Sequence, residues 1–147
     1  IEIYYDDTTL IAQSANFEFF TKLINGRFPD YNRVIPQEIK RRLRLSRDKM
    51  IEGIKTVSII SESTKIVFAP QTISFESIVE DNSEAKTTIE FATGLEEEIY
   101  VGVKNRYLLD FLQSIEEDHF EFGFNDSNLA FTVSSNELKT VIMPINL

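Results

Sequence analysis

The side chains able to do acid–base or nucleophilic chemistry are few in this sequence. It has one histidine, His119, no cysteine, and two runs of consecutive carboxylates, Glu96 to Glu98 and Glu116 to Asp118. A glycosidase-type hydrolase needs two carboxyl groups facing one cleft, whereas neighbouring residues of a strand point to opposite faces. We therefore expect both acidic runs to be solvated turns and His119 to be a surface residue.

Patterns that bind phosphates, metals or cofactors are also missing from the sequence. It has no glycine-rich phosphate loop and no metal-ligand spacing, and without cysteine it can form neither a disulfide nor a thiolate metal site. We predict no catalytic residue, no metal and no cofactor. A small hydrolase that uses paired carboxylates stays open as an alternative.

Composition limits the class of protein. A chain of 147 residues with 42% hydrophobic residues fits one domain, or one domain and a piece of another. It begins with Ile1 rather than methionine and shows no signal peptide or membrane-spanning run, so we expect a fragment with no membrane partner. The formal charge of -9 repels nucleic acid on average, so any DNA contact must come from locally clustered cations.

Apolar periodicity predicts a strand-rich chain with two helices. Residues 39–46 alternate as a half-buried strand whose outer face is basic, and Ser46 is the expected side-chain cap of the first helix, residues 47–60. A second helix is expected over 104–115, with its i,i+4 pair Arg106 and Asp110. The expected strands are three within residues 1–24, then 64–70, 72–80, 84–92, 96–103, 119–124, 129–134 and 138–145.

The end of the first helix has two interpretations. Met50, Ile51, Ile54 and Val57 share one helical face and predict its contact with the core, but Ile59 and Ile60 fall on or beside the polar face. Either the helix frays and both isoleucines turn into the core, or they form a small apolar patch for another subunit.

A supersecondary unit occurs twice. From Ile39 onward the order strand, helix, three strands is repeated, which predicts an α+β fold of two similar halves. Strand edges of the two halves can pair into continuous sheets, with both helices on one side.

Two motifs at opposite ends of this repeat carry a family resemblance. The stretch LINGRFPDYNRVIP, residues 23–36, and the ending VIMPINL, residues 141–147, resemble the bacterial DNA polymerase III β subunit, the sliding clamp. The resemblance implies a DNA clamp domain: a duplicated β-α-β-β-β unit with two helices on one face of antiparallel sheets. It also implies that residues 1–30 are the last strands of the middle clamp domain with the linker, and that 31–147 are the third domain.

The resemblance implies a function as well. Clamps are non-catalytic processivity subunits that encircle duplex DNA as head-to-tail homodimers in the bacterial cytoplasm, associated with the nucleoid during replication. Replicative polymerase, clamp loader and repair polymerases dock through short linear peptides that carry a leucine and an aromatic anchor. A freestanding peptide-binding adaptor without DNA contact is the alternative.

The resemblance assigns roles residue by residue. A partner-peptide pocket is expected from Pro29, Arg33, Val34, Tyr107, Val141, Met143, Pro144, Ile145 and Leu147. The DNA channel is expected to use Arg47, Lys49, Lys55, Lys104 and Arg106, and the ring dimer interface Ile59 and Ile60. Asn146 departs from the arginine common in clamps, which puts any salt bridge at that position in doubt. Without the rest of a clamp the chain cannot close a ring, although its first three strands can pair with a second copy.

Overall fold

The computed structural model describes residues 1–26, 30–78, 85–136 and 138–147. They form two compact units, Ile1–Tyr31 and Asn32–Leu147. The expected pocket residue Pro29 lies outside the described residues.

The first unit is a three-stranded antiparallel sheet in the order β1-β2-β3. Its strands are β1 (Glu2–Tyr5), β2 (Thr9–Ser14) and β3 (Phe17–Lys22). The Asp6 carboxylate accepts backbone N–H bonds from Thr8 and Thr9 at 2.7 and 2.8 Å, which forms the turn between β1 and β2. The three antiparallel strands expected within residues 1–24 are therefore confirmed.

The second unit contains the repeated pattern. A short 3-10 helix, η1 (Tyr31–Arg33), spans the boundary between the two units. The first half consists of β4 (Arg41–Ser46), α1 (Arg47–Ser58), β5 (Ser63–Phe68), β6 (Thr72–Ser77) and β7 (Lys86–Glu90). The second half consists of β8 (Ile99–Lys104), α2 (Asn105–Ser114), β9 (His119–Phe124), β10 (Phe131–Ser135) and β11 (Leu138–Ile142).

Each half gives its first strand to the sheet of the other half. The two sheets have the orders β11-β10-β9-β4 and β7-β6-β5-β8, and all neighbouring strands are antiparallel. Arg44 of β4 lies opposite Glu121 of β9, and Ile66 of β5 lies opposite Val101 of β8. The expected pairing between halves is confirmed, and it takes the form of two sheets linked by exchanged strands.

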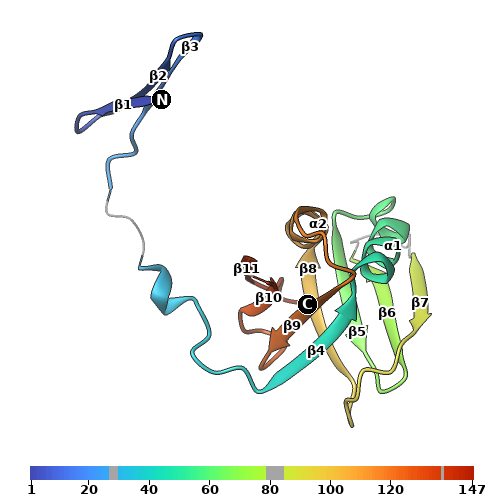
Figure 1. The fold of residues 1–147 in the computed structure, drawn as a ribbon. Coiled ribbons are helices and arrows are strands. Elements are labelled where there is room, and N and C mark those ends of the chain that lie inside the picture. The colour runs from blue at the N-terminus through green and yellow to red at the C-terminus, as the bar shows by residue number, and fades with distance from the viewer. Residues whose placement is uncertain (27–29, 79–84, 137) are drawn as a thin grey trace. The chain divides into compact units, whose positions relative to one another are not determined.

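The starts of the two helices are bonded reciprocally. The N–H of Arg47, first in α1, donates to the Asp118 carbonyl at 2.8 Å, and the N–H of Asn105, first in α2, donates to the Glu62 carbonyl at 2.9 Å. The side chains repeat the relation, because Arg47 Nε donates to the Leu112 carbonyl and Asn105 Nδ2 to the Ser61 carbonyl, both at 2.8 Å. Each helix start is thus tied to the end of the other helix, and Figure 1 shows α1 and α2 side by side.

Phenylalanine rings join the two sheets in the core. Phe68 of β5 lies 5.1 Å from Phe122 and 6.0 Å from Phe124 of β9, measured between ring centroids, and all three rings are fully buried. Contacts between rings at such distances stabilise a fold beyond the gain from burying their apolar area. The core face predicted for the first helix is confirmed for Met50, Ile54 and Val57, which are fully buried, and Ile51 is partly buried against the same core.

Two local expectations were wrong, and one of the two interpretations of the end of the first helix is excluded. Ser46 makes no side-chain capping bond, and the first helical N–H, that of Arg47, donates to the Asp118 carbonyl, which continues the pairing of β4 with β9. Helix α1 ends at Ser58, and Ile59 and Ile60 are 84% and 45% exposed, so the interpretation in which both turn into the core is excluded and the apolar patch is left. The last strand ends at Ile142 rather than residue 145, and Pro144, which lacks an N–H, follows it closely.

Gly53 gives the first prediction. A Cβ at this position of α1 would lie 2.3 to 2.5 Å from ring carbons of Phe75, which is fully buried and cannot move aside. We expect Gly53→Ala to lower the free energy of unfolding by about 1–2 kcal/mol, because overpacking costs more than the gain in helix propensity. Urea unfolding measures this change. Gly26→Ala is the control, since among the described residues no atom beyond Gly26 and its chain neighbours lies within 4 Å of its Cβ position, and an equal effect of both substitutions would contradict the packing argument.

Candidate functional site

A groove of about 580 Å³ lies between α2 and β11. Helix α2 contacts β11, and the groove is lined from the helix by Tyr107, Asp110, Phe111 and Ser114, and from the strand and the residue after it by Leu138, Thr140, Val141, Ile142 and Met143. Phe111 and Ile142 are buried, whereas Tyr107 and Met143 are 54% and 62% exposed. The groove therefore offers an apolar floor and exposed, adaptable walls, which suits apolar anchors of a ligand.

The groove unites three of the predicted pocket residues, Tyr107, Val141 and Met143. Pro144, Ile145 and Leu147 continue from Met143 toward β8, where Ile145 forms an isolated antiparallel bridge with Gly102. Arg33 and Val34 are exposed and do not line the groove.

Sequence reasoning missed several residues of the groove. Asp110 was noted only for its ion pair, and Phe111, Leu138, Thr140 and Ser114 were not singled out. Leu138 carried a usable signal, because it is a large apolar residue at the start of an edge strand and is 41% exposed.

The five predicted channel cations differ in what they contact. Arg47 is 28% exposed and bonds Asp48 as well as the Leu112 carbonyl, so it holds the two helices together. Lys49 donates to the Glu90 carbonyl at 3.2 Å, and Arg106 pairs with Asp110 at 3.5 Å as expected from their spacing. Within the described residues, the exposed side chains of Lys55 and Lys104 have no bonded partner, which leaves them most available for an anionic ligand.

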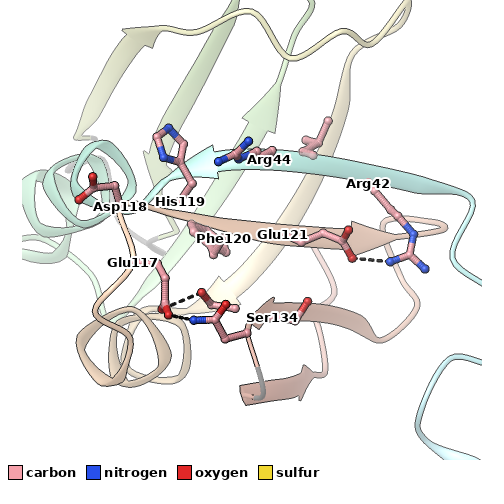
Figure 2. A pocket seen from close by; sticks show the side chains of 11 residues that line it. Arg42, Arg44, Glu117, Asp118, His119, Phe120, Glu121 and Ser134 are labelled. Carbon is pink, nitrogen blue, oxygen red and sulfur yellow. Dashed lines mark hydrogen bonds and ion pairs between the residues drawn. The ribbon is translucent and has the colours of Figure 1, made fainter.

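The acidic runs occupy separate hollows. Glu96 and Glu97 line one hollow with Arg41, whereas Glu117, Asp118 and His119 line another on the outer face of β4, β9 and β10. In Figure 2 the side chains of Glu117 and His119 extend in opposite directions, and Glu121 pairs with Arg42. This arrangement brings no carboxylate of one run to a carboxylate of the other.

Glu117 is held as a carboxylate. Its oxygens accept bonds from the Ser135 hydroxyl at 2.8 Å and from the Asn136 amide. The Ser135 bond is the main reason that the pKa of Glu117 lies below its ordinary value, with its backbone hydrogen bond adding to the effect. A general acid needs the opposite shift.

The described residues contain no cluster of three or more candidate metal ligands. In the same part of the chain, neither helix has the length and apolar character needed to cross a membrane.

The duplicated fold with exchanged strands and paired helices is that of a sliding clamp domain, and the family comparison agrees. Residues 32–146 match the family described as "DNA polymerase III beta subunit, C-terminal domain". The chain therefore belongs to the DNA polymerase III beta subunit family.

Relatives support this assignment along the whole chain. The beta sliding clamp of Helicobacter pylori strain J99 is 29% identical to this chain, and the match covers 97% of this chain and 41% of that protein. The beta sliding clamp of Vibrio cholerae is 26% identical, covering 95% of this chain and 40% of that protein. The chain thus spans about two fifths of the length of the curated relatives it matches.

Solved structures agree as well. The crystal structure of the Helicobacter pylori beta clamp bound to a DNA ligase peptide matches with a TM-score of 0.84 and 27% identity, over 99% of this chain and 40% of that chain. The sliding clamp of Bartonella birtlesii bound to griselimycin matches with a TM-score of 0.83 and 26% identity, over 99% of this chain and 41% of that chain. The expected family and fold class are confirmed.

The Glu117 contacts give the second prediction. Because the folded-state pKa is lowered, this carboxylate stabilises the fold above its unfolded pKa of about 4.3, and the contribution is lost as the pH falls through the folded pKa. We expect an NMR titration of the Glu117 carboxyl carbon to have its midpoint below the ordinary value of a glutamate, and Ser135→Ala to move it upward. A midpoint above the ordinary glutamate value would contradict this account of the Glu117 contacts.

Proposed function

We propose that this chain acts as part of a bacterial processivity clamp that encircles duplex DNA as a head-to-tail dimer and docks partners through short linear peptides. In this proposal residues 1–30 are the last strands and linker of a middle domain, and 31–147 are the third domain. The clamp itself is non-catalytic and works in the bacterial cytoplasm. The family match and the likeness to a clamp bound to a DNA ligase peptide support the proposal.

The observation that carries the docking proposal is the groove of Tyr107, Val141 and Met143. Its floor is apolar, its walls are exposed, and its volume of about 580 Å³ is within the range of sites that take small ligands or peptide side chains. A leucine and an aromatic ring of a partner would each bury apolar area there, and Tyr107 can add a hydrogen bond at the rim. Polymerases, clamp loader and repair polymerases are the proposed donors of such peptides. Pro29, Arg33 and Val34 remain predicted additions to this pocket.

The helix pair supports the DNA proposal. Lys55 on α1 and Lys104, the last residue of β8 directly before α2, are exposed cations in a chain whose formal charge is -9, and α1 contacts α2. Such cations would meet phosphates without reading sequence, and the contacts would weaken steeply with salt. Ile59 and Ile60, exposed after α1, are the proposed contact with the neighbouring subunit.

Met143 tests peptide docking. We expect Met143→Ala to weaken binding of a synthetic peptide with a leucine and an aromatic anchor about tenfold, because Met143 forms the apolar wall against which those anchors would pack. Isothermal titration calorimetry measures the dissociation constant. Leu129→Ala is the matched control, since Leu129 is 54% exposed and lies outside the groove. Unchanged affinity of the Met143 variant would count against the groove as the docking site.

Lys55 and Lys104 test the DNA contact. We expect charge reversal of both, in the full-length ring, to shorten retention on a nicked circular DNA and to reduce the salt dependence by roughly one unit of log slope for each lost phosphate contact. Lys40→Glu, an exposed cation before β4, is the control. Normal retention of the double variant at low salt, with peptide binding intact, would favour the adaptor without DNA contact.

A further inference from the structure

The segment that follows β11 crosses to the other sheet. Strand β11 belongs to the sheet of β9 and β10, whereas β8 is the edge strand of the second sheet. Three residues past the end of β11, the Ile145 N–H donates to the Gly102 carbonyl of β8 at 2.8 Å, and the two residues form an antiparallel bridge. Segment 143–147 is therefore fastened to the free edge of β8.

Gly102 permits this approach because it has no side chain. A Cβ at this position would lie 2.7 Å from the Ile145 carbonyl oxygen, a backbone atom, and 3.1 Å from Cγ of Leu147. A separation under 3 Å from backbone cannot be relieved by rotating a side chain. Gly102 is buried in β8, so its role is to leave space for the segment rather than to adopt an unusual backbone conformation.

Met143 is consequently held on both sides. Ile142, the residue before it, pairs with Phe131 of β10, and Ile145, two residues after it, is bridged to Gly102. Pro144 further restricts Met143 to extended backbone. An exposed methionine with three rotatable bonds would otherwise be a poorly defined groove wall.

We propose that Gly102 is a positioning residue for the partner-peptide groove, which rests on the proposed docking function. Gly102 fixes segment 143–147 on β8, and this fixes the Met143 wall on the groove side. Ile145 and Leu147 then serve as anchors of the segment on β8, while Met143 and Tyr107 contact the partner peptide. Preorganisation of this kind lowers the entropy lost on binding.

The test compares Gly102→Ala with Leu147→Ala, which trims the segment and leaves β8 unchanged. We expect each substitution to lower the affinity for the leucine-and-aromatic peptide about two- to tenfold. We also expect each to speed hydrogen exchange of the Ile145 amide selectively, whereas a general loss of core stability would speed exchange at many amides. The variant that carries both Gly102→Ala and Leu147→Ala should bind the peptide as tightly as the single variant with the lower affinity, because both substitutions disrupt the same contact. Met143→Ala should lower the peptide affinity further when it is combined with either substitution, because Met143 contacts the peptide itself.

Three outcomes decide the inference. Slow Ile145 exchange and unchanged affinity in Gly102→Ala would overturn it, as would fully additive losses in the double variant. If Gly102→Ala does not fold, Leu147→Ala decides alone, and unchanged affinity with slow Ile145 exchange overturns the inference. If Met143→Ala binds the peptide normally, the proposed docking site itself has failed, which is distinguishable from failure of the Gly102 contact.

Discussion

The exchange of first strands between the two halves is the constraint on which the second unit depends. Strand β4 completes the sheet of β9 to β11, and β8 completes the sheet of β5 to β7, so neither half has a full sheet alone. The first residue of each helix then donates its N–H to the carbonyl just before the strand that follows the other helix. The helix pair is thus a consequence of the strand exchange, and the buried rings of Phe68 and Phe122 seal the contact between the sheets.

The two proposed functional surfaces, the groove and the exposed cations near the helices, follow from that scaffold. Because α2 begins where β8 ends and contacts β11, the groove has a rigid helix on one side and a sheet edge on the other. The same connection presents Lys104 at the start of α2, while α1 presents Lys55. Arg47 bonds to the Leu112 carbonyl and so joins the two helices, which leaves fewer cations available to a ligand than the sequence alone indicates.

The sequence predicted the order and type of the elements well, since apolar periodicity is a local property. Alternating Leu43 and Leu45 are buried in β4 as expected, and the repeated order of elements agrees with the apolar periodicity of the sequence. Contacts made at a distance were less accessible. The N–H of Arg47 at the start of α1 bonds to Asp118, 71 positions further along, and segment 143–147 is bridged to Gly102. No local sequence pattern around Asp118 or Gly102 predicts these contacts. For the groove, the family motif pointed to Met143, but only tertiary structure added Leu138 and Asp110.

Amide hydrogen exchange of the chain with and without a peptide carrying a leucine and an aromatic anchor would test the central claim most directly. If the scaffold creates a docking groove between α2 and β11, saturating peptide should slow exchange in residues 107–114 and in residues 138–143 together, because both walls close on one ligand. Slowed exchange confined to other segments, or to only one wall, would contradict the account.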